Sequence, residues 1–149
     1  MTHRTLIARF RGSAQNHPGR EAIVQQARSI TYADLLASAE NAAAFLLERD
    51  LIANEELIGV HGTRSISTII AMLAAMMAGG AYVPIPSSLP ENRKLEIIRE
   101  GKIRTILRDD SGSSKEIGDI NQLDIHSICS GEQSSIDFPV LKAEQLAYV

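Results

Sequence analysis

The sequence has one cysteine, Cys129, and no run of more than two basic residues. A single thiol excludes an internal disulfide and leaves a zinc site without thiolate partners, so a reducing cytoplasm is the expected compartment. The 15 Lys and Arg residues are scattered among 18 Asp and Glu residues, and the net charge is -3. Because no basic stripe is available to neutralise phosphates, a nucleic-acid partner is not expected.

Long apolar segments of the kind that enter membranes are also missing. The N-terminus has no apolar run of signal-peptide length. Residues 66–89 carry no charge, but two glycines interrupt this stretch in its middle and two prolines follow them. Because glycine weakens a helix and proline removes a backbone donor, the stretch favours a helix at about 65–78 and a strand at 81–85. No membrane partner is therefore expected.

Apolar residues follow helical and strand periods in alternation over residues 1–108. The predicted helices cover about residues 5–15, 31–49, 65–78 and 90–101, and the predicted strands about residues 22–24, 29–31, 57–61, 81–85 and 103–107. The first two strands form a hairpin, and Thr31 with Asp34 approximates a capping box at the second helix. Strands that alternate with helices through short connections predict an α/β fold, with a mostly parallel sheet flanked by helices.

The chain after residue 108 has a weaker pattern. Residues 109–140 are predicted to form an irregular surface segment with one short strand near residues 124–128, because turn-forming residues dominate and apolar ones are scattered. The Asp109-Asp110 pair lacks the following ligands of a calcium loop and is expected to be solvated.

The predicted helix at 65–78 is unusually apolar. Between Ile66 and Ala78, 11 of 13 residues are apolar, so no face is left for water. A small open sheet covers only one side of a flanking helix, and this helix needs a further layer. The additional cover comes from the first helix or the capped helix of this chain, or from a different polypeptide. The sequence leaves these alternatives open.

Several motifs point to one enzyme family. They are Thr31-Tyr32-Ala33-Asp34-Leu35-Leu36, Arg64-Ser65, Met77-Ala78-Gly79-Gly80-Ala81-Tyr82-Val83-Pro84-Ile85, Pro90 and Arg93. In order and spacing, these motifs resemble the first core motifs of the amino-acid adenylation domains of nonribosomal peptide synthetases, within the adenylate-forming superfamily. The Gly-Gly-Ala-Tyr-Val-Pro string is rather specific to that superfamily. Pro86 departs from the pattern because the family usually has an acidic residue there, so the turn after this strand is expected to be remodelled.

The resemblance implies a domain organisation. It runs from about Phe10 to Leu107 and returns at residues 144–149, which look like the strand leading to the family's phosphate-binding loop. Residues 1–149 would then be the N-terminal portion of an AMP-binding adenylation domain, a partial N-terminal subdomain of the adenylate-forming fold. An α/β core would cover residues 1–108, the irregular segment 109–140, and the strand before the phosphate loop 141–149.

The resemblance also implies a chemistry that these residues do not perform by themselves. The family activates a carboxylic acid, usually an amino acid, with ATP to an acyl-adenylate and transfers it to the thiol of a carrier protein. The phosphate loop, the acid-specificity pocket and the mobile lysine of the family would all follow the position of Val149. We therefore assign no catalytic, cofactor-binding or metal-binding residue to this chain, and the acid stays open. ATP and Mg²⁺ are expected in the completed enzyme.

Three hypotheses on function follow. The favoured one is a divided adenylation enzyme, in which this chain is inactive alone and its partners are a complementary polypeptide and, as a further candidate, a carrier protein. The alternative is a truncated, non-catalytic binding or scaffold module of the same family. The third is an independent small nucleotide-binding α/β protein.

Other candidate sites have simpler structural interpretations. The loop at residues 59–65 lies between a strand and a helix, where anions bind, but lacks a phosphate-loop pattern, so Ser65 is expected to act as a helix cap. No two of the four histidines have the i, i+4 spacing of a metal site, and His61 is expected to pack at a strand end. Cys129 lacks an activating base and is expected to be a packing residue. The three methionines of the predicted 65–78 helix are expected to fill the core rather than form an adaptable contact surface.

Overall fold

The computed structural model describes residues 5–109, 117, 120–130, 138–139 and 141. In chain order the elements are α1 (Leu6–Asn16), β1 (Glu21–Gln25), β2 (Arg28–Thr31), α2 (Tyr32–Glu48), β3 (Leu57–Gly62), α3 (Ile66–Met77), β4 (Ala81–Pro86), α4 (Glu91–Glu100), β5 (Thr105–Arg108), β6 (Asn121–Asp124) and α5 (Ile125–Cys129). One parallel sheet has the strand order β4-β3-β5-β6, and β1 and β2 form a separate antiparallel hairpin. The predicted α/β fold with a mostly parallel sheet flanked by helices is confirmed.

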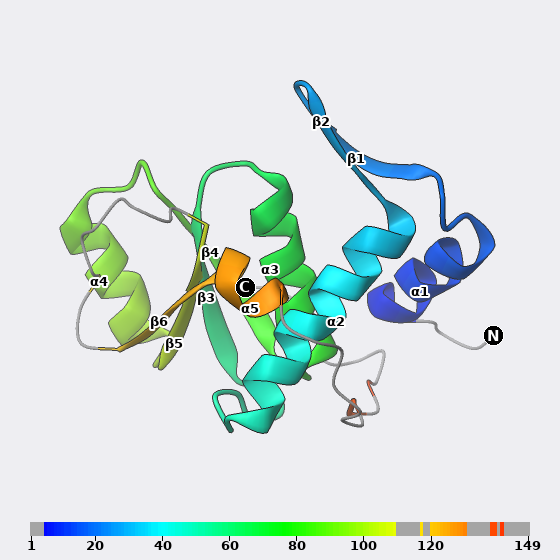
Figure 1. Ribbon diagram of the computed structural model, residues 1–149. Helices are drawn as coiled ribbons and strands as arrows, with labels where there is room; N and C mark the ends of the chain where they lie inside the picture. Colours follow the sequence, from blue (N-terminus) through cyan, green and yellow to red (C-terminus); the bar gives the residue numbers. More distant parts are fainter. Residues whose placement is uncertain (1–4, 110–116, 118–119, 131–137, 140, 142–149) are drawn as a thin grey trace.

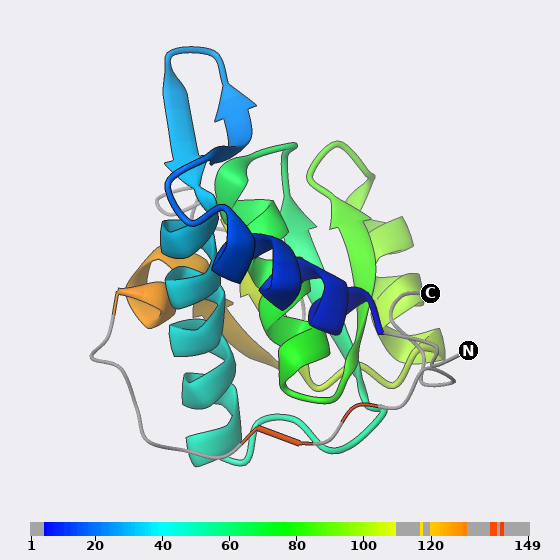
Figure 2. The same ribbon diagram turned by 90° about the vertical axis from the view of Figure 1, so that its right-hand side faces the viewer.

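The sheet separates two hydrophobic cores. Helix α4 covers one face of the sheet and α3 covers the other, while α2, α5 and α1 pack around α3 on that second side (Figure 1). Turning the molecule shows α1 lying across this helical layer and the β1–β2 hairpin projecting beyond the end of α2 (Figure 2). The smaller core, beneath α4, includes Ile98, Ile106 and Ile117, and the larger one lies between the sheet and the other helices.

Side-chain caps fix the starts of the two long central helices. The Thr31 hydroxyl accepts the backbone N–H of Asp34 at 3.2 Å, as the capping pattern predicts. The Ser65 hydroxyl accepts the N–H of Thr68 at 3.1 Å and caps α3. At the other end of α3, Gly79 has a φ of 91°, a conformation that glycine adopts without a steric penalty. The predicted limits of this helix are therefore confirmed.

Helix α3 obtains most of its cover from this chain. Seven of its residues, from Ile70 and Ala71 through Leu73–Met77, are buried between the sheet and helices α1, α2 and α5. Of the alternatives that the sequence left open, cover by the chain's own helices accounts for this part of α3. The first turns differ, because Ile69 is 39% exposed. Among the described helices, none is both long and apolar enough to cross a bilayer.

The segment after β5 differs from its prediction. The predicted irregular surface segment at 109–140 contains, in its described part, a fourth sheet strand, β6, which pairs with β5. The strand predicted near 124–128 is wrong, since residues 125–129 form α5. Ile125 and Ile128 are buried, and a spacing of three places them on one side of a helix, whereas a strand would place them on opposite sides. Residues 142–149, which include most of the predicted last strand, lie outside the described residues.

Strand β4 forms one edge of the sheet in the described structure. The N–H of Ala81 donates to the carbonyl of Glu56, just before β3, and the N–H of Ser87 donates to the carbonyl of Gly62, the last residue of β3. Because donors alternate along a strand, the even-numbered residues between them face away from β3. Two of these positions are proline, at 84 and 86, and proline has no N–H. The outer edge of β4 therefore offers no backbone donor at either position.

Candidate functional site: an apolar groove at the ends of β3 and β4

The candidate site lies outside the carboxyl ends of β3 and β4. The connection after β3 leads to α3 on one face of the sheet, and the connection after β4 leads to α4 on the opposite face (Figure 1). Ligands of open α/β sheets bind outside the carboxyl ends of the strands. A groove with a cavity volume of about 760 Å³ lies here, within the size range of small-molecule and cofactor sites.

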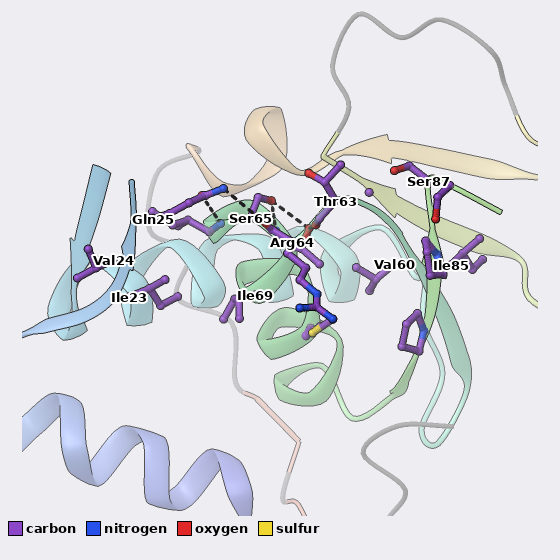
Figure 3. Close-up of a pocket in the computed structure, with 17 residues that line it drawn as sticks. Ile23, Val24, Gln25, Val60, Thr63, Arg64, Ser65, Ile69, Ile85 and Ser87 are labelled. Atoms are coloured by element: carbon purple, nitrogen blue, oxygen red, sulfur yellow. Dashed lines mark hydrogen bonds between the residues drawn. The ribbon is translucent and has the colours of Figure 1, made fainter. Parts of the chain in front are cut away.

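Strands β1, β3 and β4 and the start of α3 form the walls of this groove, and most of the side chains are apolar. Strand β1 contributes Ile23, Val24 and Gln25; the loop before α3 and its first two turns contribute Thr63, Arg64, Ser65, Ile66, Thr68, Ile69 and Met72; the ends of β3 and β4 contribute Val60, Gly62, Pro84, Ile85 and Pro86, followed by Ser87 and Ser88. Figure 3 shows the β1 side chains on one side of the cavity, and Ile85 and Ser87 on the other. The groove therefore joins segments that are distant in sequence.

The side chain of Gln25 joins the hairpin to the start of α3. Its Nε2 donates to the carbonyl of Arg64 at 3.1 Å, and its Oε1 accepts the N–H of Ile66 at 3.2 Å. The side-chain amide of Gln25 thus pairs with the carbonyl before the capping residue Ser65 and with the helix-terminal N–H after it. This pair of bonds sets the position of the hairpin wall relative to α3.

A carboxylate already occupies the N-terminus of α3. Asp109, directly after β5, accepts a hydrogen bond from the Ser65 hydroxyl at 2.5 Å, and the same oxygen lies 2.9 Å from the Thr68 hydroxyl. The prediction that the Asp109-Asp110 pair is solvated is therefore wrong for Asp109, because the carboxyl ends of parallel strands meet at one edge of the sheet and β5 brings Asp109 to the cap of α3. Asp110 lies outside the described residues. An anion there would be repelled by this carboxylate, which argues against phosphate binding at residues 59–65. The interpretation of Ser65 as a cap is confirmed.

The remaining candidates are structural in the described part of the chain. His61 is 3% exposed within β3, and Met76 and Met77 are buried in the core, whereas Met72 lines the groove. Burial raises the pKa of the Cys129 thiol, which disfavours the reactive thiolate. No three His, Cys, Asp or Glu side chains among the described residues are grouped so that they could hold a metal ion.

Sequence reasoning missed Gln25 and Asp109. A signal for Asp109 was available, because it follows a predicted strand whose carboxyl end must lie beside that of its neighbour, where Ser65 begins a helix. No signal in the sequence marked Gln25, because its role depends on the angle at which the hairpin leaves α2.

Comparison with known proteins identifies the family. The profile of the family described as AMP-binding enzyme matches residues 10–147. The chain belongs to this family. Among relatives of the AMP-binding enzyme family, tyrocidine synthase 1 of Brevibacillus parabrevis is 32% identical over 94% of this chain and 13% of its own length. Bacitracin synthase 3 of Bacillus licheniformis is 27% identical over 99% of this chain and 2% of its own length.

Solved structures of AMP-binding enzymes show which part of the fold this chain represents. The N-terminal subdomain of Klebsiella oxytoca NpsA matches with a TM-score of 0.85 and 27% identity, over 99% of this chain and 38% of that one. The nonribosomal peptide synthetase FmoA3 shares the fold, with a TM-score of 0.88 over 97% of this chain and 16% of that one. The chain is thus the N-terminal part of an adenylation domain and spans well under half of these proteins.

Proposed function

We propose that this chain supplies the N-terminal α/β portion of an adenylation enzyme whose remainder resides in a complementary polypeptide. The completed enzyme activates an amino acid or another carboxylic acid with ATP. The acid carboxylate attacks the α-phosphate, pyrophosphate leaves, and the acyl-adenylate then passes its acyl group to the thiol of a carrier protein. The observation that carries the proposal is the match of residues 10–147 to the AMP-binding enzyme family.

Two solved structures of one relative, NpsA, support the substrate class and the carrier partner. The NpsA N-terminal subdomain forms a complex with 3-hydroxybenzoyl-AMSN, at 27% identity to this chain. NpsA has also been joined to ThdA as an artificially fused adenylation–PCP di-domain. By analogy, an aromatic or amino acid is the substrate class to test first, and a carrier protein is the expected second partner.

The start of α3 does not fit a phosphate group of ATP. The carboxylate of Asp109 lies at the N-terminus of α3, where a phosphate would otherwise accept backbone N–H bonds. We propose that the nucleotide and its metal bind to the complementary polypeptide and that this chain is inactive alone.

Amino-acid-dependent exchange of pyrophosphate into ATP tests this function. The chain, the polypeptide carrying the downstream remainder of the domain, and their mixture are each assayed with the same set of amino and aromatic acids. We expect exchange only in the mixture. Exchange by this chain alone would refute its inactivity, and no exchange at any mixing ratio would refute the divided enzyme.

One observation favours the alternative of a non-catalytic module. The burial of most of α3 by helices of this chain removes one reason for a permanent partner. A scaffold module would unfold cooperatively as a monomer and show no exchange in any mixture. Stabilisation by ATP without a partner would instead support an independent nucleotide-binding protein, since a ligand of the native state raises the melting temperature.

A further inference from the structure

Exposed apolar side chains gather in the groove between the hairpin and α3. Four large hydrophobic residues among the described ones are exposed, and two of these, Val24 at 65% and Ile69 at 39%, line this groove. The other two, Leu6 and Leu95, do not line it. The groove also has polar residues, among them Thr63, Ser87 and Ser88. Apolar surface that is concentrated in a concave site and bordered by polar residues marks a place where another molecule packs.

A cation extends over this apolar surface. Figure 3 shows the Arg64 side chain reaching from the start of α3 toward the space between Ile69 and Val60. Within the described part of the chain, no carboxylate forms a salt bridge with the Arg64 guanidinium. Arginine is enriched at the centres of protein interfaces because its planar group binds a carboxylate through two parallel hydrogen bonds. The complementary charge for the Arg64 side chain is therefore negative.

Both walls of the groove are held in place before anything binds. The two hydrogen bonds of Gln25 join the hairpin to α3, and the Ser65 and Asp109 pair joins the start of α3 to the end of β5. A preformed surface loses little conformational entropy on association, so contacts made there contribute more fully to affinity.

We infer that this groove is the docking site for the complementary part of the same adenylation domain. That part inserts apolar side chains between Val24 and Ile69 and presents an Asp or Glu to Arg64. This inference rests on the proposed function and names the surface through which the two parts join. It agrees with the match to the NpsA N-terminal subdomain, since this chain covers 38% of that protein and the rest of the subdomain must pack on it.

Two other occupants fit the groove less well. A second copy of this chain, related by a two-fold axis through the groove, would bring two Arg64 guanidinium groups into one interface, where like charges repel. A small molecule is normally enclosed over most of its surface, whereas the Val24 wall is largely open to solvent. The nearby edge of β4 has prolines at 84 and 86, so a partner joins through side chains there and not by adding a strand.

Substitutions at exposed positions test the docking site with little effect on folding. Val24→Lys places a charge in the apolar groove, and Arg64→Glu reverses the cation. Leu95→Lys is the matched control, because Leu95 is 37% exposed and lies on α4, outside the groove. Binding of each full-length variant to the polypeptide that carries the downstream remainder is measured by isothermal titration calorimetry, and circular dichroism checks each fold.

We expect Val24→Lys and Arg64→Glu each to raise the Kd by at least about tenfold, and Leu95→Lys to change the Kd by less than about twofold. Arg64→Lys should retain more affinity than Arg64→Glu. If Val24→Lys fails to fold, Ile69→Lys replaces it against the same control. Wild-type binding and pyrophosphate exchange that the groove variants leave unchanged would overturn the docking site while the proposed function stood. No wild-type binding or exchange would overturn both, and a homodimer that Val24→Lys dissolves would assign the groove to a second copy.

Discussion

Gly80, the glycine directly before β4, gives the sharpest test of how α3 and β4 are joined. A Cβ atom at this position would lie within 2.8 Å of the Glu56 carbonyl oxygen and would overlap the Cδ1 atom of Ile52. Neither neighbour can move easily. The Glu56 carbonyl accepts the N–H of Ala81 at 2.9 Å beside the start of β3, and Ile52 is only 5% exposed. Gly80→Ala therefore overpacks a rigid site and should cost about 1–3 kcal/mol of unfolding free energy.

Thermal and urea unfolding, followed by circular dichroism, measure this loss. For a chain of this size, about 2 kcal/mol corresponds to a fall in Tm of about 4–8 °C. The matched control is Gly12→Ala in the middle of α1, where an added Cβ meets nothing within 4 Å. This control should stabilise by about 0.5–1 kcal/mol, because alanine favours a helix more than glycine does. A Gly80→Ala variant as stable as the wild type, beside a stabilised control, would refute the packing argument.

Three further changes follow from particular contacts. Gly79→Val should lower the unfolding free energy by about 1–3 kcal/mol, because a β-branched residue is strained at a φ of 91°, and an unchanged Tm would contradict this end of α3. The hydrogen bond from Arg104 lowers the pKa of Glu56, so its stabilisation is present above the unfolded-state pKa and is lost as pH falls through the lower folded-state pKa. Between about pH 6 and about pH 3, the urea midpoint of the wild type should therefore fall more than that of Glu56→Gln. The same fall of the urea midpoint with pH in both proteins would refute this. Asp109→Ala removes the acceptor of the Ser65 hydroxyl and should cost about 1 kcal/mol in urea unfolding, whereas a midpoint at or above the wild-type value would count against a structural role.

The elements up to residue 108 were predictable because local chemistry agrees with tertiary packing there. Thr31 caps α2, Ser65 caps α3 and Gly79 ends α3, and each has a local sequence signal. The predicted limits of α4, residues 90–101, are each one residue too wide, because the helix is Glu91–Glu100 and Pro90 is the residue before it.

The fourth strand and α5 were not predictable in the same way. Strand β6 is short, and its assignment depends on pairing with β5, a contact that crosses more than ten intervening residues. Ile125 and Ile128 have a helical spacing, but a helix of five residues is too short to produce a periodic pattern. The groove was also beyond the sequence, because it depends on how the hairpin lies relative to α3.

Two features of the sequence suggested a partner, the family motifs and the apolar composition of α3, and the structure supports them unequally. The family motifs predict correctly that the chain is the N-terminal part of an adenylation domain. The apolar composition of α3 suggested a missing layer, but the chain covers most of that helix itself. What remains exposed is confined to its first turns, around Ile69. A search for partner contacts should therefore begin at this end of the helix.

The two prolines of β4 affect how copies of this protein behave at high concentration. An open sheet edge with a complete row of donors can pair with the same edge of a neighbouring molecule and start aggregation. At positions 84 and 86 this edge lacks donors, so intermolecular β-pairing cannot propagate along it. Of the two outer strands in the described sheet, β4 is therefore the less suited to pair with a further strand.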